Sequence, residues 1–211
     1  MIFVSAYPGS CLTIVFMTIV AILLAAGESS RMGRPKPLLP WHGKTLVEAQ
    51  VGNLLEGGVD EVFVVTGKSD PETAPVLKKL AHCHRVHNPD YMHGKTTSVR
   101  AGIAALPDSA TSVLLLAVDQ PRPAWVIKRV IESHRASGAP LTSPRYHGHG
   151  GHPLMFDASL RDELAAITEE RQGIREVFQR HEDQMNAVEF DNEIIRLDMN
   201  TPEAYELALN S

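Results

Sequence analysis

The sequence predicts an α/β protein whose central sheet is mostly parallel. Largely apolar runs over residues 18–24, 61–66 and 112–118 are typical of strands buried on both faces of such a sheet. Segments with apolar residues at helical spacing, over residues 47–55 and 96–106, lie between them. Alternating strands and helices imply parallel strands joined by right-handed crossovers. Ligands of such folds bind beyond the carboxyl ends of the strands, so we expect the chemistry there.

Local signals define the other elements of the first half. A pair of glycines ends the helix over residues 47–55. Asp70 and Pro71 suit the N-cap and the first position of the next helix. A short strand over residues 85–87 completes a β-α-β-α-β series.

The second half continues this alternation. The predicted elements are a helix over residues 124–137, strands over 141–143 and 154–156, and short helices near 160–164 and 174–178. Residues 185–190 and 194–197 are candidates for a pair of terminal strands. Thr201 and Pro202 fit the N-cap and first position of a last helix.

The composition narrows the class of protein. With 211 residues and 44% hydrophobic content, the chain suits one globular domain, which we place at residues 17–211. A net charge of −5 disfavours a broad nucleic-acid surface, whereas a free nucleotide needs only local cations. Cys11 and Cys83 provide neither a disulfide framework nor metal-ligand spacing, which fits the reducing cytoplasm.

Residues 1–16 are expected to be an extension of this domain. They contain no Lys or Arg, so the basic region of a secretory signal is missing. The apolar stretch over residues 11–26 is shorter than the ~20 residues of a membrane helix and continues into the first strand. We therefore expect no membrane association. Because Met17 directly precedes that strand, translation starting at Met17 is our hypothesis for the origin of the extension.

The loop that follows the first strand has the features of a polyphosphate site. The strand ends in small residues, and Gly27 permits unusual backbone angles. Arg31, Arg34 and Lys36 follow within ten residues, and cations beside free backbone N–H groups bind phosphate. Prolines on both sides of Lys36 predict a stiff, extended segment that presents its side chain.

Two well-known phosphate motifs do not account for this loop. It lacks the alternating glycines of the dinucleotide fingerprint. Gly-Lys-Thr triplets occur at residues 43–45 and 94–96, but the earlier glycine of a P-loop is replaced by Leu38 and Pro89, respectively.

A longer pattern is more specific. Residues 24–40 read Leu-Ala-Ala-Gly-x-Ser-x-Arg-Met-Gly-x-x-Lys-x-Leu-Leu-Pro, which resembles the signature loop of the molybdenum-cofactor nucleotidyltransferases, the MobA/MocA-like family of cytidylyl- and guanylyltransferases. Further blocks of the family are matched by residues 88–102, 118–121, 148–153 and 198–202. The resemblance covers residues 18–208. It implies a three-layer Rossmann-like nucleotidyltransferase fold with a mostly parallel, mixed central sheet.

The nucleotide is expected at the signature loop, at neighbouring strand ends and along the second block. The candidate nucleotide-binding residues are Leu24, Ala25, Ala26, Gly27, Lys36, Gly67, Asn88, Ser98 and Gly102. Gly102 costs its helix about 1 kcal/mol relative to Ala, so it should allow close packing against either the sheet or a ligand. The block departs from many relatives at Lys95, where an apolar residue is usual.

Three residues are candidates for catalysis and two for metal binding. We assign Arg31 and Lys36 to the phosphates, and Asp119 to catalysis through a metal. An ionised carboxylate at the end of an apolar strand must be solvated or bound to a cation, and Mg²⁺ is the natural partner in a phosphate site. Pro121 places the next helix too late for Asp119 to be its N-cap. Asn200 stands where the family usually has a second acidic ligand.

The acceptor is expected near Gly151 and His152, in a segment that resembles the family's Gly-x-x-Gly-His-Pro block. At the two positions where the family block usually has basic residues, this sequence has His149 and Gly150. His147, His149 and His152 lie close in sequence, but no cysteine or carboxylate lies among them, so a zinc site is not expected.

Together these features predict Mg²⁺-dependent transfer of a nucleotidyl group to molybdopterin, with release of pyrophosphate. Ala26 favours CTP over GTP, because Leu-Ala-Ala-Gly is associated with cytidylyl transfer in this family. The implied partners are a nucleoside triphosphate, a molybdopterin-type acceptor and a molybdoenzyme that receives the cofactor. Two alternatives stay open: transfer to a sugar phosphate, methylerythritol phosphate or phospholactate-type acid, and a nucleotide-binding regulatory or carrier protein without turnover.

Overall fold

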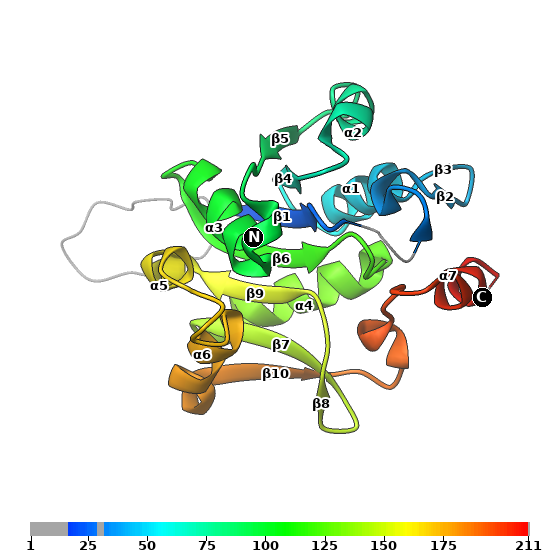
Figure 1. Cartoon of the computed structure of the whole chain (residues 1–211). Helices are drawn as coiled ribbons and strands as arrows, with labels where there is room; N and C mark the ends of the chain where they lie inside the picture. The colour runs from blue at the N-terminus through cyan, green and yellow to red at the C-terminus, as the bar shows by residue number, and fades with distance from the viewer. Residues whose placement is uncertain (1–16, 29–31, 211) are drawn as a thin grey trace.

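A computed structural model describes residues 17–28 and 32–210, and shows a central sheet with helices on both faces (Figure 1). The sheet strands are β1 (Thr18–Ala25), β4 (Glu61–Thr66), β5 (Cys83–His87), β6 (Ala110–Ala117), β7 (Leu141–Tyr146), β8 (His149–Gly150), β9 (Leu154–Asp157) and β10 (Met185–Glu189). A separate two-stranded sheet joins β2 (Pro40–Trp41) to β3 (Lys44–Thr45). The expected extension at residues 1–16 lies outside the described residues.

The order of the main sheet is β10-β7-β9-β6-β1-β4-β5, with β8 paired to β7. β1 pairs in parallel with both β4 and β6, and β4 pairs in parallel with β5. β9 is antiparallel to both of its neighbours, β6 and β7, whereas β10 is parallel to β7. The predicted mixed, mostly parallel sheet is therefore confirmed.

Within the described residues, seven α-helices surround the sheet. They are α1 (Leu46–Glu56), α2 (Asp70–Leu77), α3 (Lys95–Ala105), α4 (Ala124–Ser137), α5 (Arg161–Ala165), α6 (Ile174–Arg180) and α7 (Pro202–Leu209). Thr45 and Glu48 form a reciprocal capping box at the start of α1. The predicted cap of α7 is confirmed, because the Thr201 side chain accepts a hydrogen bond from the Ala204 N–H. No described helix has both the length and the apolar character needed to cross a membrane.

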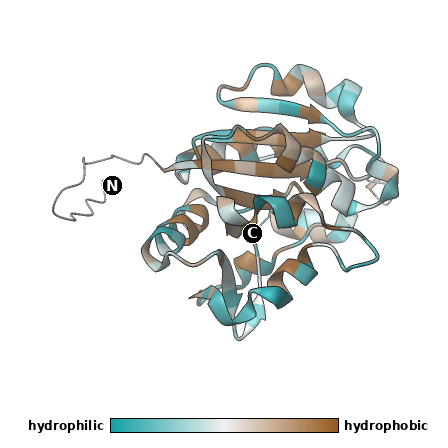
Figure 2. Ribbon diagram, turned by 90° about the vertical axis from the view of Figure 1, so that its left-hand side faces the viewer, coloured by the Kyte–Doolittle hydropathy of each residue, from teal (hydrophilic) through white to brown (hydrophobic). Residues whose placement is uncertain are grey.

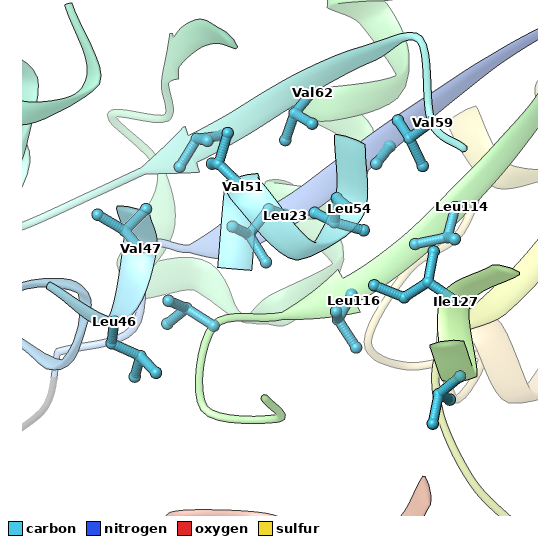
Figure 3. Close-up of a cluster of buried hydrophobic side chains, with 14 of the residues drawn as sticks. Leu23, Leu46, Val47, Val51, Leu54, Val59, Val62, Leu114, Leu116 and Ile127 are labelled. Atoms are coloured by element: carbon cyan, nitrogen blue, oxygen red, sulfur yellow. The ribbon is translucent and has the colours of Figure 1, made fainter. Parts of the chain in front are cut away.

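The strands have two apolar faces, and each face supports a separate core. In β1, Ile19, Ala21 and Leu23 join the core under α1 and α4, whereas Val20 and Ile22 join the core under α3, α5 and α6. Figure 3 shows the first of these cores, with Leu23 among side chains of α1, α4 and the neighbouring strands. Figure 2 shows hydrophobic residues concentrated in the central strands. Burial of each such side chain contributes roughly 1.5–3 kcal/mol, so the continuous apolar runs are the main source of the fold.

Three local predictions were wrong. Ser69, not Asp70, is the N-cap of α2, and the Asp70 carboxylate instead pairs with Arg85. Residues 194–197 do not form a strand: Glu193–Arg196 is a 3₁₀ helix that begins after Asn192, whose side chain accepts the Ile194 N–H. The segment around Lys36 is also a 3₁₀ helix, Lys36–Leu38, not an extended stretch.

The sheet topology places a crevice at the ends of β1 and β6. The chain leaves β1 through α1 and pairs β4 on one side, and it returns through α3 to β6 on the other side. Helices α1 and α3 pack on opposite faces of the sheet. This reversal of strand order is a topological switch point, where open α/β sheets bind ligands beyond the carboxyl ends of the strands.

Candidate active site

A cavity of about 450 Å³ lies at this switch point. It is lined by Leu24, Ala25, Ala26, Gly27, Glu28, Met32, Lys36, Pro37, Tyr91, Met92, Gly94, Lys95, Ser98, Ala117, Val118, Asp119 and Asn200. The size is within the range of small-molecule sites. Many predicted site residues, from five separate parts of the chain, therefore meet at one cavity.

The end of β1 forms the floor of the cavity. Leu24 at this end is fixed to the end of β6, because its carbonyl accepts the Val118 N–H at 2.9 Å. Gly67 does not line the cavity but supports this floor: a Cβ there would lie 2.5 Å from the Ala26 carbonyl oxygen and 2.8 Å from the Tyr91 ring. Because Gly67 has no side chain, Ala26 and Tyr91, which both line the cavity, can pack directly against its backbone.

Helix α3 forms one wall. Ser98 lines the cavity, and the buried Asn88 lies behind it and donates 3.0 Å hydrogen bonds to the hydroxyls of Ser98 and Thr97. Asn88 also accepts the Asp90 N–H, so it links the end of β5 to the start of α3. Asn88 is therefore placed to orient this wall through its hydrogen bonds to Thr97 and to the cavity-lining Ser98.

Gly102 is part of α3, is buried on the side of the helix that faces the sheet, and does not line the cavity. A Cβ at this position would lie 2.6 Å from Ile22 Cγ2 and 3.2 Å from Val65 Cγ2. Of the two expected reasons for this glycine, the structure shows close packing of α3 on the sheet.

Opposite this wall, Lys36 lies between the two predicted metal ligands. Its ammonium donates to Asp119 Oδ2 at 2.7 Å and to Asn200 Oδ1 at 2.9 Å. The Lys36 and Asp119 side chains are only 15% and 21% exposed, so this ion pair is partly shielded from water. Two side-chain oxygens thus hold a positive charge at the edge of the cavity. The same donor set suits Mg²⁺ or Mn²⁺, which commonly bind one or two protein oxygens and complete their coordination with phosphate.

Backbone contacts fix the positions of the two predicted ligands relative to each other. Asp119 follows β6 in a turn in which the Gln120 side chain accepts the Ala117 N–H. The Asp119 carbonyl accepts the Met199 N–H at 2.8 Å, which ties the neighbour of Asn200 to this turn. Asp119 does not cap α4, whose N-cap is Pro123. The described residues contain no cluster of three or more His, Cys, Asp or Glu that could hold a metal by itself.

The predicted acceptor residues lie beside the cavity, on the segment between β8 and β9. A Cβ on Gly151 would lie 2.5 Å from the Ile195 carbonyl oxygen, so glycine is needed for this contact. The His152 N–H donates to the same carbonyl at 2.8 Å. Burial, together with the nearby charges of Arg122 and Lys95, lowers the pKa of His152 to about 4. The imidazole is therefore neutral at pH 7.

Sequence reasoning missed two features of the site. Arg122 is fully buried behind the acceptor segment, yet its sequence context, an Arg between two prolines, gives no sign of burial. Lys95 lines the cavity from the first turn of α3, whereas in the sequence it stands out only as a departure from relatives. The predicted catalytic Arg31 lies outside the described residues.

Comparisons with known proteins agree with this geometry. A family model described as a MobA-like NTP transferase domain matches residues 21–185. The chain is 36% identical over 165 residues to nicotine blue oxidoreductase of Paenarthrobacter nicotinovorans, covering 74% of this chain and 79% of that protein. It is 32% identical over 187 residues to the molybdenum cofactor cytidylyltransferase of Escherichia coli strain K12, covering 87% of this chain and 92% of that protein.

The fold also matches solved structures. The crystal structure of Rv0371c from Mycobacterium tuberculosis H37Rv has a TM-score of 0.79 at 26% identity, covering 92% of this chain and 99% of that chain. A complex of Rv0371C with manganese has a TM-score of 0.76 at 25% identity, covering 92% and 100%. The matched signature loop, the switch-point cavity and the family model together show that the chain belongs to the MobA-like NTP transferase family of nucleotidyltransferases.

Proposed function

We propose that this protein transfers a nucleotidyl group, with CMP favoured, from a nucleoside triphosphate to the phosphate of molybdopterin. The observation that carries the proposal is the pair of oxygens of Asp119 and Asn200 that hold a cation at the edge of a nucleotide-sized cavity. In the reaction, an acceptor phosphate oxygen attacks the α-phosphorus, the bond to the bridging oxygen breaks, and pyrophosphate leaves. Such transfers depend on positioning and on neutralising charge, which this site supplies without a covalent nucleophile.

Each part of the cavity has a role in this proposal. The backbone at residues 25–27 binds the nucleotide, and Ser98 faces its nucleoside part. Lys36 leaves the two oxygens and binds the phosphates, where it neutralises the charge of the leaving pyrophosphate. Arg31 remains a predicted second phosphate ligand. The neutral imidazole of His152 positions the acceptor by hydrogen bonding and leaves charge neutralisation to the cations.

A divalent metal fits the proposed reaction. Asp119 and Asn200 would hold Mg²⁺, and the bound ion would neutralise the charge of the reacting phosphates. The manganese complex of the structurally similar Rv0371C supports a divalent metal in this fold. Because Asn200 offers an uncharged oxygen, Asp119 supplies most of the anchoring.

The choice of CTP and molybdopterin has separate support. Ala26 lines the cavity, and the similar protein from Escherichia coli is named a molybdenum cofactor cytidylyltransferase. Another relative is named an oxidoreductase, so a family name alone does not choose the reaction. The cation held by two oxygens favours phosphate chemistry over hydride transfer.

The proposal is tested with four nucleoside triphosphates against molybdopterin, a sugar phosphate, methylerythritol phosphate and phospholactate, with pyrophosphate release as the readout. We expect Mg²⁺-dependent release with CTP and molybdopterin. Release with another acceptor alone would reassign the substrate. Tight CTP–Mg²⁺ binding without release from any acceptor would instead indicate a regulatory or carrier protein.

A pair of variants tests the site itself. Asp119→Ala should reduce turnover by at least ~10²-fold, because Asp119 is the charged member of the Asp119–Asn200 pair that holds the cation. Asp183→Ala, at an exposed position on the 3₁₀ helix Glu182–Gln184, is the control and should leave turnover unchanged. Near-wild-type turnover of a folded Asp119→Ala protein would contradict the metal assignment.

A further inference from the structure

The residues that we propose for metal and acceptor binding come from three distant segments of the chain. Asp119 follows β6, the acceptor residues precede β9, and Asn200 lies near the C-terminus after a 3₁₀ helix. The segment between that helix and α7 has no strand or helix to hold it, yet it must place Asn200 within 3 Å of the Lys36 ammonium. One side chain, that of Arg122, connects all three segments.

Arg122 is 0% exposed and donates four hydrogen bonds to backbone carbonyls. Nε donates to the His152 carbonyl at 2.9 Å, Nη2 to the Ile195 carbonyl at 2.8 Å, and Nη1 to the Leu197 and Pro121 carbonyls at 3.0 and 2.9 Å. The rigid fork of the guanidinium fixes the directions of these bonds, which a flexible ammonium would not. The acceptor segment and the chain before Asn200 are thus set against the turn that carries Asp119.

Burying this cation is costly because it loses its hydration, and the four carbonyl dipoles offset only part of that loss. Burial lowers the pKa of Arg122 to about 10, and the charges of Asp198 and Asp119 act in the opposite direction, so it stays protonated at neutral pH. An apolar side chain could fill the same volume without this cost. The residue therefore needs a reason beyond packing, and its four acceptors supply one.

We propose that Arg122 is a positioning residue. It sets the distance between Asp119 and Asn200, the two predicted metal ligands, and couples the acceptor segment to them. The coupling to the acceptor rests on the proposed function, but the effect on the cation ligands does not. Arg122 touches neither the β1 end nor α3 through these bonds, so nucleotide binding should depend on it least.

The test compares Arg122→Lys and Arg122→Met with the same substitutions at Arg161. Arg161 also donates to three backbone carbonyls, those of Pro107, Ile103 and Leu106, but at the amino end of β6, away from the site. Each protein is measured at the same interval below its own Tm. The readouts are Mn²⁺ affinity by electron paramagnetic resonance, KM for each substrate, kcat, and hydrogen exchange of the Met199 amide.

We expect Arg122→Lys to weaken Mn²⁺ binding by about tenfold, as loss of a group that orients a metal ligand commonly does. KM for the acceptor should rise while KM for the nucleotide changes less than twofold, and the Met199 amide should exchange faster. The Arg161 variants should lower Tm without these changes. If Arg122→Met does not fold, Arg122→Lys carries the test, because it keeps the charge and the aliphatic stem.

The proposal is overturned if the Arg122 variants lose only stability and match the Arg161 variants in Mn²⁺ affinity and Met199 exchange. Failure of the proposed function has a different signature. In that case the wild-type protein fails to release pyrophosphate with any of the acceptors tested. The exchange rate of the Met199 amide still shows whether Arg122 positions the ligands.

Discussion

Replacing Lys36 by Met should have opposite effects on metal binding and on turnover. The Lys36 ammonium is hydrogen-bonded to both oxygens that we propose as metal ligands, at 2.7 Å from Asp119 and 2.9 Å from Asn200. A metal ion that binds without nucleotide must first displace it. The Met variant removes this competition and nearly preserves side-chain volume, so Mn²⁺ affinity in the absence of nucleotide should increase.

The size of the increase follows from the strength of the contact. Exposed ion pairs contribute up to about 1 kcal/mol, and hydrogen bonds to charged groups contribute about 1.5–3 kcal/mol. For side chains that are 15% and 21% exposed, we expect the contact of Lys36 with Asp119 to contribute about 1–2 kcal/mol. Its removal should tighten Mn²⁺ binding by about 5- to 30-fold. Turnover should nevertheless fall by ~10²–10³-fold, because the phosphates lose a cation.

Titration of Mn²⁺ by electron paramagnetic resonance measures the first effect, and pyrophosphate release measures the second. Lys128→Met on the exposed face of α4 makes the same change in net charge and should alter neither. If the Lys36 variant bound Mn²⁺ no more tightly than the control, the ammonium would not compete with the metal, and this reasoning would be refuted. Near-normal turnover would show that Lys36 does not act on the phosphates.

Three further predictions concern packing, capping and pH. Gly102→Ala should lower the free energy of unfolding by about 1–2 kcal/mol in urea, because overpacking 2.6 Å from Ile22 outweighs the gain in helix propensity; greater stability would contradict it. Thr45→Ala should cost about 1 kcal/mol, and a double-mutant cycle with Glu48→Ala should show coupling; strict additivity would exclude the capping box. His152 has a folded pKa of about 4 and a reference value of 6.5, so below pH 6.5 the unfolded state binds more protons and stability falls towards pH 4, by up to about 3 kcal/mol. His152→Gln should flatten this loss, and an unchanged pH dependence would contradict the assignment.

Strand and helix positions were predictable because their side chains obey short periods. The run from Ile19 to Leu24 is apolar at every position, and the structure divides it between the two cores. The ends of these strands then indicated the site, because parallel strands place their carboxyl ends at one edge. Ala26 and Asp119, predicted from these strand ends, and Asn200, predicted from the family pattern, line one cavity.

Contacts across long stretches of chain were not predictable in this way. Arg122 and Ile195 are 73 positions apart, and no periodicity records that a cation will be buried against a distant carbonyl. The strand predicted over residues 194–197 was wrong for a related reason. Its β-branched residues favour a strand, but the Asn192 cap and the hydrogen bonds from Arg122 to the Ile195 and Leu197 carbonyls stabilise a 3₁₀ helix and the residue that follows it. Competing local hydrogen bonds overrode intrinsic propensity here.

One side of the proposed site therefore comes from residues of the matched family region, and the other side depends on contacts between segments that are far apart in the sequence. The proposed nucleotide side lies on one loop and one helix, within the residues 21–185 that match the family model. Asn200 lies beyond that match, so its assignment does not follow from the family model. It was predicted from the resemblance of residues 198–202 to the family's last block, and two contacts support it: the 2.9 Å hydrogen bond from Lys36 and the hydrogen bond from the Met199 N–H to the Asp119 carbonyl. Because Arg122 and these few contacts hold the C-terminal segment, we expect changes there to alter metal and acceptor binding more than nucleotide binding.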